Sequence, residues 1–446
     1  LHTCTFTRNC FVSYLSVINM VGCFGRVNIV VSFLFMCLCG STAAQRFLSV
    51  SGQNLTLNGE KVFMSGMNQA WYIYGNDFGN GRYNASRPAF LKAMDEIHES
   101  GGNSVRVWVH IEGENTPVFN SSGYVTGLDP YIIGDMTDYV RQAQTRNILV
   151  NFCLWSCAIL QTGSHLEGLL YEDAKLFSYI NNALKPMVEA LKNERGLGIW
   201  EIMNEPAGCI EIGMKTDEKC YDTTTLYPWE GADWTKKHVP LERMLRFLSL
   251  QADAIHSVDP KALVTTGSWT YRTITDQLNR RNFYSDECLG LASGSLPGAY
   301  FDLYQIHTYQ TLFVYLPHDP FKVNASVYNV SKPLIIGEFS QDQGGGMTSP
   351  EQFTWAYEHG YSGAWSWDAL GSGQAADDVP TQERGMGSIK DRNDQSKGGR
   401  VNITINDGYM KQNPQGFGVI RDIFWIILNV FGAFNVFLTS VVKTLL

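Results

Sequence analysis

Short apolar runs alternate along the chain with longer amphipathic segments. Eight of the apolar runs have the length and composition of buried β-strands, and they span residues 62–71, 104–110, 147–155, 196–206, 263–269, 300–309, 333–340 and 363–369. Apolar residues recur at helical spacing between them, among others in residues 88–100, 131–145, 172–194 and 241–257. Strands that alternate with helices in this way are typical of parallel sheets. The pattern therefore predicts an α/β protein.

The number of repeats favours a closed barrel. They fill residues 45–406, and their count and size suit a (β/α)8 TIM barrel better than an open doubly wound sheet. A dinucleotide-binding fold would also place Gly-x-Gly-x-x-Gly after its first strand, and no such loop follows residues 62–71. We expect residues 45–406 to form a single (β/α)8 domain.

Residues 1–44 are typical of a leader. Read from Met20, Arg26 is followed by an apolar run and then by small residues up to Ala44, which is the pattern of a secretory signal peptide. Residues 1–19 would then be untranslated sequence or a longer leader. Six Asn-X-Ser/Thr sequons suit the secretory route, and they begin at Asn54, Asn84, Asn120, Asn324, Asn329 and Asn402. We expect a secreted, extracellular glycoprotein.

Residues 407–446 form an apolar C-terminal extension. Within it, residues 423–442 carry no charge over about the length of a membrane span. A membrane anchor, a lipid-anchor signal that is later removed, a buried helix and a mispredicted exon are all compatible with this run. A membrane is therefore expected as a partner only if residues 423–442 are a true anchor.

Composition narrows the class of partner. The 446 residues are 13% aromatic, and their net charge of -9 argues against nucleic acid, which binds basic surfaces. The 11 Trp and 21 Tyr residues suit a carbohydrate partner, because aromatic rings stack on the apolar faces of sugar rings.

Five cysteines follow Ala44, and an oxidising compartment favours their pairing. Cys209 and Cys220 could close a short loop, and because the number is odd at least one thiol would be left over. Cys153 and Cys157 have no second pair at zinc-site spacing, so we predict no metal.

Polar and aromatic residues gather at the carboxyl ends of the predicted strands, where barrel enzymes carry out their chemistry. In chain order they are Trp71, Tyr72, Arg106, Trp108, His110, Trp155, Asn204, Glu205, Trp269, His307, Tyr309, Glu338, Trp365 and Trp367. One such residue could be an accident of the fold. So many at one rim indicate a substrate site.

Two glutamates stand out in this set. Glu205 ends the apolar run GIWEIMNEP, and Glu338 ends PLIIGEF, on the fourth and seventh predicted strands. Two carboxylates facing each other across a groove are the minimal requirement for cleaving a glycosidic bond, because one donates a proton while the other attacks the sugar or activates water. A separation of about 5–5.5 Å would retain the configuration at the sugar, and about 6.5–9.5 Å would invert it.

NEP on the fourth strand and GEF on the seventh resemble glycoside hydrolase family 5. Within that family, WEIMNEP and GAWSWDA are most similar to the animal-type endo-β-1,4-mannanases, and the resemblance covers roughly residues 46–406. It implies a retaining double displacement without a cofactor, in which Glu205 is the acid/base and Glu338 the nucleophile. The implied substrate is a polysaccharide, namely β-mannan, glucomannan or galactomannan.

The resemblance also implies supporting roles. Asn204 would bind the sugar 2-hydroxyl, and Arg106 would keep Glu338 ionised, as a nearby cation does. Tyr309 would hydrogen-bond Glu338, and His307 would support Glu205.

The remaining implied roles are those of the subsite walls. Trp365 would form the floor of the cleavage subsite, and Trp367 would extend it. Many family members have a histidine at the end of the third strand, where this chain has Trp155.

Several of these residues also have a purely structural interpretation. His307 could be a satisfied core histidine. Trp108, Trp155 and Trp269 could pack in the barrel rather than line the substrate groove, for which Trp71 is also a candidate. Glu201 lies in the middle of its strand, so we interpret it as a buried ion-pair partner rather than a second catalytic acid. Arg106 could be its partner.

Other functions are compatible with the same residues. An endo-β-1,4-glucanase would use the same barrel and glutamates, since mannose and glucose differ only at the 2-hydroxyl. A non-catalytic or membrane-tethered carbohydrate-binding protein is the alternative outside the enzymes, and the presence of both glutamates argues against it.

Overall fold

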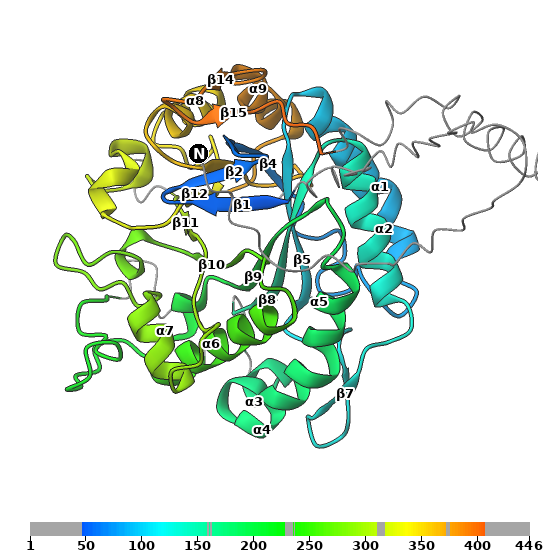
Figure 1. The fold of residues 1–446 in the computed structure, drawn as a ribbon, viewed down its shortest axis with the longest axis vertical. Coiled ribbons are helices and arrows are strands. Elements are labelled where there is room, and N and C mark those ends of the chain that lie inside the picture. The colour runs from blue at the N-terminus through cyan, green and yellow to red at the C-terminus, as the bar shows by residue number, and fades with distance from the viewer. Residues whose placement is uncertain are drawn as a thin grey trace, which may run out of the picture. The chain divides into compact units, whose positions relative to one another are not determined.

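The barrel predicted from the sequence is present. The computed structural model describes residues 47–157, 160, 163–227, 235, 237–309, 317–371 and 375–405. In these residues eight parallel strands close into a barrel (Figure 1). The strands, in order around the barrel, are β4 Met64–Asn68, β5 Ser104–Ile111, β8 Leu149–Ser156, β9 Leu197–Asn204, β10 Val264–Ser268, β11 Tyr304–His307, β12 Leu334–Phe339 and β13 Gly363–Ser366. Each overlaps one of the eight predicted apolar runs, so the predicted fold class is confirmed.

Helices surround the strands (Figure 1). Their bounds are α1 Tyr83–Glu99, α2 Ile132–Thr145, α3 His165–Tyr171, α4 Asp173–Tyr179, α5 Lys185–Leu191, α6 Leu241–Val258, α7 Asp286–Ser293, α8 Ser349–Glu358 and α9 Val379–Ser388. α1 begins before the predicted residue 88, because the added turn buries Tyr83 and Ser86 even though Pro88 lacks a backbone N–H. The segment predicted as one helix at 172–194 is divided by a π-helical turn, η1 (Ile180–Leu184), between α4 and α5.

A small antiparallel sheet packs against the amino ends of the barrel strands. It consists of β1 Leu48–Ser51, β2 Asn54–Leu57 and β3 Glu60–Lys61. Leu48, Leu55 and Leu57 form one buried cluster with the first inward residues of the barrel, such as Met64 and Ile199. The amino end of the barrel is therefore filled by apolar side chains, which leaves its carboxyl end for polar ones.

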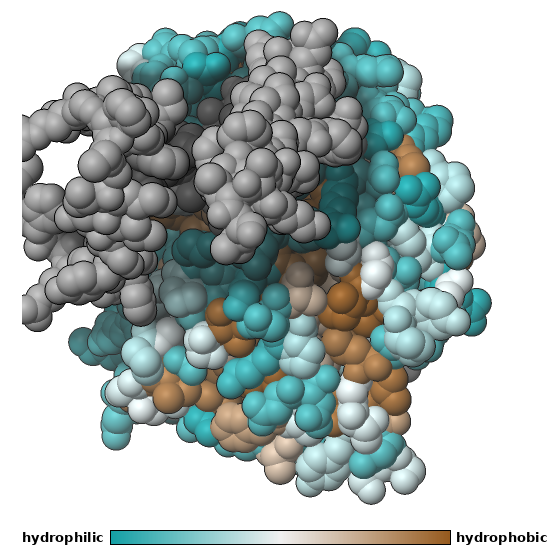
Figure 2. Space-filling model, turned by 45° about the vertical axis from the view of Figure 1, so that its right-hand side comes forward, coloured by the Kyte–Doolittle hydropathy of each residue, from teal (hydrophilic) through white to brown (hydrophobic). Residues whose placement is uncertain are grey.

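The other strands form short hairpins outside the barrel. They are β6 Val118–Phe119 with β7 Val125–Gly127, and β14 Asn393–Asp394 with β15 Gly399–Arg400. Short 3-10 turns are η2 Pro206–Cys209, η4 Tyr271–Thr273, η5 Pro320–Lys322 and η6 Ala325–Tyr328. The coloured part of the face in Figure 2 is mainly hydrophilic, with a hydrophobic strip right of centre and smaller hydrophobic patches below. Some apolar surface of this kind is usual for a folded domain.

The disulfides differ from the predicted pairing. Cys157 is bonded to Cys209 and Cys220 to Cys288, so the predicted Cys209–Cys220 loop is wrong. Cys157 follows β8 and Cys209 follows β9, and these neighbouring parallel strands bring the two thiols together although they are 52 residues apart. Cys153, which is buried in β8, is the free thiol among the described residues.

Both chain ends that we interpreted from the sequence, residues 1–44 and 407–446, lie outside the described residues. In the part of the chain that the structure describes, no helix combines the length and apolar character needed to span a membrane.

Candidate active site

The two predicted glutamates lie at the carboxyl ends of β9 and β12. β9 contains one extra residue relative to β10 between Glu201 and Asn204, and β12 contains one extra residue relative to β11 just before Glu338. An extra residue of this kind reverses which side chains face inward. Asn204 and Glu338 therefore point into the barrel, where regular alternation would have placed Met203 and Gly337.

Glu205 follows directly after Asn204 in an uncommon backbone conformation. Its φ of 48° and ψ of 52° are left-handed, a region that costs a residue with a Cβ about 1–2 kcal/mol. The strain is offset locally, because the N–H of Glu205 donates to the carbonyl of Gly267 at 2.6 Å. Such strain is common in residues whose side chain must point at a substrate.

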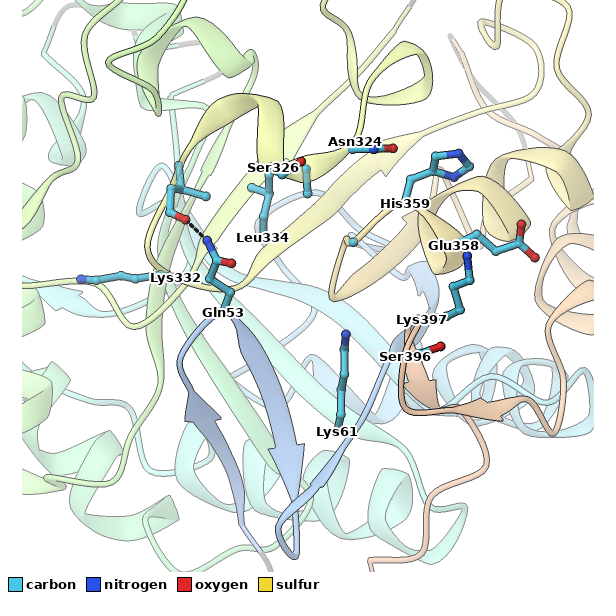
Figure 3. A pocket seen from close by; sticks show the side chains of 13 residues that line it. Gln53, Lys61, Asn324, Ser326, Lys332, Leu334, Glu358, His359, Ser396 and Lys397 are labelled. Atoms are coloured by element: carbon cyan, nitrogen blue, oxygen red, sulfur yellow. Dashed lines mark hydrogen bonds between the residues drawn. The ribbon is translucent and has the colours of Figure 1, made fainter.

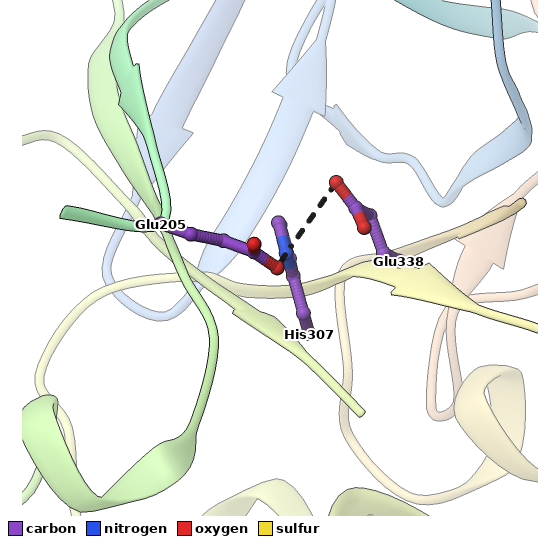
Figure 4. A group of neighbouring side chains, drawn as sticks. All are labelled: Glu205, His307 and Glu338. Atoms are coloured by element: carbon purple, nitrogen blue, oxygen red, sulfur yellow. Dashed lines mark hydrogen bonds and ion pairs between the residues drawn. The ribbon is translucent and has the colours of Figure 1, made fainter. Parts of the chain in front are cut away.

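The two carboxylates are close together and shielded from water. Glu205 is 5% exposed and Glu338 4%. One carboxylate oxygen of each and Nδ1 of His307 all lie within 4.8 Å of one another. Nδ1 of His307 is 2.5 Å from Oε1 of Glu205 and 3.4 Å from Oε1 of Glu338, so the histidine lies between them (Figure 4). The close approach of their oxygens is compatible with the short carboxyl separation of retaining glycosidases.

Arg106 of β5 is completely buried beneath the glutamates, and all five of its N–H donors have acceptors. Nη1 donates to Glu338 Oε1 at 2.7 Å and to Asn68 Oδ1 at 2.9 Å. Nη2 donates to Asn204 Oδ1 at 2.7 Å and to Glu201 Oε1 at 2.6 Å, and Nε donates to Glu201 Oε2 at 2.7 Å. The prediction that Glu201 is a buried ion-pair partner is confirmed.

The surroundings make the two glutamates chemically unequal. Burial and the charge of Glu338 raise the pKa of Glu205 well above its ordinary value. Burial also raises the pKa of Glu338, to about 7, but the charge of Arg106 and the hydroxyl of Tyr309 oppose that rise. Arg106 thus acts on Glu338 in the predicted direction. Glu205 holds its proton more firmly, and Glu338 is the one that ionises near neutral pH.

His307 and Tyr309 touch the carboxylates as the resemblance implied. Burial and the nearby charge of Arg106 lower the pKa of His307 well below its ordinary value, so its ring is neutral beside Glu205. The hydroxyl of Tyr309 donates to Oε2 of Glu338 at 3.0 Å. Burial raises the pKa of this hydroxyl well above its ordinary value, so it stays protonated as a donor near neutral pH.

Glu205, His307 and Glu338 are also close enough together to contact one metal ion. The chemistry of the neighbours opposes this use. Arg106 places a permanent positive charge 2.7 Å from Glu338, and burial favours the protonated, neutral form of Glu205. We therefore interpret the three side chains as an acid–base site.

Three tryptophans pack together next to Arg106, whose guanidinium carbon lies 5.5 Å from the ring of Trp108. The ring of Trp71 lies 4.8 Å from that of Trp108 and 5.7 Å from that of Trp367. Trp71 and Trp367 are half-buried, so part of each ring is open to a ligand, whereas Trp108 is buried behind them. Trp269 is half-buried as well and lies 5.8 Å from the ring of Tyr309.

Two of the predicted wall residues lie elsewhere. Trp365 is fully buried in the apolar cluster at the amino end of the barrel, and its Nε1 donates to Ser104 Oγ at 2.9 Å. Trp155 is fully buried against the outer helices, and its Nε1 donates to Gln251 of α6. Their predicted contact with substrate is therefore wrong, because no part of either ring reaches the groove. The half-buried tryptophan after β13 is Trp367.

Sequence reasoning missed several residues around Arg106. Cys153, not Trp155, faces the site from β8, with its sulfur 3.9 Å from Nη2 of Arg106. Asn68 of β4 accepts from Arg106 and donates to the carbonyl of Gly337 at 2.9 Å. A Cβ at Gly267 would lie only 2.5 Å from Oε1 of Glu201, so this position needs glycine. Side chains along a strand point alternately into and out of the barrel, and this alternation could have predicted that Asn68 and Cys153 face inward.

A cavity of about 300 Å³ lies at the opposite end of the barrel (Figure 3). Its lining includes Gln53, Lys61 and Leu334, which come from the small sheet and the start of β12. None of the residues predicted for the site lines it. The glutamate site is therefore the better candidate for catalysis.

Comparison with known proteins identifies close relatives. A mannan endo-1,4-β-mannosidase of Mytilus edulis is 46% identical over 360 residues, which cover 80% of this chain and 96% of that protein. One of Cryptopygus antarcticus is 42% identical over 385 residues, covering 84% and 99%. The crystal structure of endo-1,4-β-mannanase from Eisenia fetida superposes with a TM-score of 0.79 at 45% identity, covering 81% of this chain and all of that one. No family model matches the chain.

The different positions of Trp365 and Trp367 predict different effects on stability. Trp365→Phe leaves a gap in the apolar cluster and deprives Ser104 of a hydrogen-bond donor, so we expect a loss of about 2 kcal/mol in the free energy of unfolding. Trp367→Phe, at a half-buried position, should change it by less than about 0.5 kcal/mol. Urea unfolding of the two variants measures both, and equal losses would contradict the placement.

Proposed function

The chain belongs to the animal mannan endo-1,4-β-mannosidases of glycoside hydrolase family 5, and we propose that it hydrolyses internal β-1,4-mannosidic bonds of mannans with retention of configuration. The identity of 42–46% over nearly the whole length of two relatives supports the substrate class. The observation that carries the mechanism is the pair of buried carboxylates whose oxygens approach within 4.8 Å.

In the first step, an ionised carboxylate oxygen of Glu338 attacks C1 of the sugar. The bond from C1 to the glycosidic oxygen breaks, and its electron pair stays on that oxygen, which takes the proton of Glu205. Glu338 becomes a neutral glycosyl ester and Glu205 becomes a carboxylate. The raised pKa of Glu205 supports its part as the acid, and the lower pKa of Glu338 supports its part as the nucleophile.

In the second step, water attacks C1 from the side that the leaving group has vacated. Glu205 takes a proton from this water, and the electron pair of the ester bond returns to Glu338. Two inversions at C1 give net retention. Both glutamates end in their starting protonation states, so the cycle needs no other reactant.

Neighbouring residues would hold the sugar. Oδ1 of Asn204 accepts from Arg106, so its amide N–H groups face other acceptors. One is the carboxylate of Glu205, and a sugar hydroxyl such as the 2-hydroxyl would be a second. The open parts of Trp71 and Trp367 suit the apolar face of a sugar ring. Glucomannan and galactomannan are further substrates that we include in the proposal.

Secretion is also part of the proposal. The leader-like residues 1–44 support it, as do two disulfides, which form in oxidising compartments. The asparagines of five sequons are exposed, namely Asn84, Asn120, Asn324, Asn329 and Asn402, and they are therefore accessible to glycosylation.

The first prediction from the proposed function concerns the reaction products. The purified protein should release short manno-oligosaccharides from β-mannan, galactomannan and glucomannan and little sugar from carboxymethylcellulose, and the fresh reducing ends should be β-anomers. Chromatography and time-resolved NMR measure the two properties. Release mainly from the cellulose derivative would identify a glucanase, and initial α-anomers would contradict retention. A folded protein that releases nothing would be a binding protein.

The second prediction separates the roles of the glutamates. Glu338→Ala should abolish hydrolysis of every substrate, because no nucleophile remains. Glu205→Ala should lose about 10²–10⁴-fold on mannan but far less on dinitrophenyl mannosides, whose leaving group needs no proton. Steady-state kinetics on both substrates, with circular dichroism to confirm folding, measures this. Equal losses of Glu205→Ala on both would contradict its role as acid.

The third prediction concerns pH. Tyr309→Phe removes a hydrogen bond that lowers the pKa of Glu338, so that pKa rises. Because Glu338 must be ionised to attack, the acid limb of the kcat/KM profile should move to higher pH. The profile of the variant against that of the native protein measures it, and a limb that stays or moves to lower pH would contradict the assignment.

A further inference from the structure

Glu201 is a buried carboxylate that the reaction steps do not use. It lies in the middle of β9, is fully buried, and cannot touch a sugar bound at the rim. Its two oxygens accept four hydrogen bonds: two from Arg106, one from Asn151 at 2.7 Å and one from Gln305 at 2.9 Å. Both oxygens of Glu201 are therefore engaged by donors, two of which come from the guanidinium with which it forms a buried ion pair.

Arg106 therefore serves two carboxylates with one positive charge. Its Nε and Nη2 bond Glu201, and its Nη1 bonds Glu338. Because all five N–H groups are engaged, the guanidinium cannot rotate toward Glu338 without breaking bonds to Glu201. Glu201 thus fixes the position of Arg106 and limits the strength of the electrostatic interaction between Arg106 and Glu338.

The charge of Glu338 changes during the double displacement. When the glycosyl ester forms, Glu338 becomes neutral, and Arg106 loses one of its two anionic partners. A buried cation without an anionic partner is strongly unfavourable. Glu201 is the anion that stays beside Arg106 in both states, at 2.6 Å from Nη2.

We propose that Glu201 is a positioning residue of the reaction, which holds Arg106 in place and keeps it ion-paired while Glu338 is esterified. The inference rests on the proposed double displacement. It assigns Glu201 a role that changes the energy of the covalent intermediate, whereas a merely structural ion pair would change only the stability of the fold.

Glu201 also affects how Glu338 titrates. The titratable and charged groups that face Glu338 are Arg106 from β5, Cys153 from β8, Glu201 and Glu205 from β9, and His307 and Tyr309 from the end of β11. Among them, Glu201 raises the pKa of both Glu338 and Glu205 by its negative charge. Without that charge, both pKa values fall.

The test is Glu201→Gln, which removes the charge at nearly constant volume. Both limbs of the kcat/KM profile should move to lower pH, by about one unit. The kcat/KM for a dinitrophenyl mannoside, which reports formation of the ester, should fall at least about tenfold. Two effects cause this fall. Before the reaction, Arg106 interacts more strongly with Glu338, which makes the Glu338 anion more stable and less reactive. After the ester has formed, Arg106 has no anionic partner.

The matched control is Gln305→Met. It removes one hydrogen bond from Glu201 but no charge, so it should leave both limbs where they are even if stability falls. Glu201→Asp takes the place of Glu201→Gln if the latter does not fold. Its shorter side chain cannot reach both guanidinium nitrogens, and both limbs should move in the same direction by a smaller amount.

Three outcomes would overturn the proposal: unmoved limbs in a folded variant at residue 201, an unchanged kcat/KM for the dinitrophenyl mannoside, or the same pH shift in Gln305→Met. Failure of the proposed function is distinguishable from these, because the native protein would then not hydrolyse the mannoside at all.

Discussion

The active site depends on the burial of one guanidinium. A buried arginine stays charged, and each of its five N–H groups needs an acceptor, since an unmet buried donor costs about 1–3 kcal/mol. Arg106 meets this requirement with Asn68 of β4, Glu201 and Asn204 of β9 and Glu338 of β12. These four residues come from three strands other than its own, so a shift in the register of any one of them would leave a donor unmet. The strand register that closes the barrel is for this reason the same register that the geometry of the site requires.

The barrel can hold these charges because its interior is layered. Side chains such as Met64, Ile199 and Trp365 fill the amino end without polar groups that need partners beyond the bond from Trp365 to Ser104. The next layer carries the pair of Arg106 and Glu201, which is away from water and therefore strong and position-sensitive. The two glutamates lie above it, where a substrate can reach them. The apolar layer supplies stability, and the ionic layer supplies orientation.

Features that depend on a single strand could be predicted from the sequence. Features that depend on how neighbouring strands pair could not. The eight apolar runs predicted the barrel, and Glu205 and Glu338 could be found because each is the carboxylate at the tip of such a run. Trp155 could not be placed, since strict alternation puts it beside Cys153, whereas at the end of β8 it packs against α6 instead. The Cys157–Cys209 bond joins the ends of two neighbouring strands, which linear spacing does not reveal. The saturation of Arg106 likewise became visible only once three other strands were in register.

Glu205 and Glu338 differ in chemistry because they are placed differently relative to the buried guanidinium of Arg106. Glu338 bonds Arg106 directly and has the hydroxyl of Tyr309 on its other oxygen, so its anion is stabilised from two sides. Glu205 has the neutral ring of His307 as its close partner, and burial then favours its protonated form. Gly267 makes this asymmetry possible. A Cβ there would lie 3.0 Å from Nε2 of His307 and 3.2 Å from Nη2 of Arg106, so any larger residue would push the histidine or the arginine away from its carboxylate. The absence of a side chain at Gly267 therefore allows the neutral His307 and the charged Arg106 to lie next to each other. Their different effects on Glu205 and Glu338 make one glutamate an acid and the other a nucleophile.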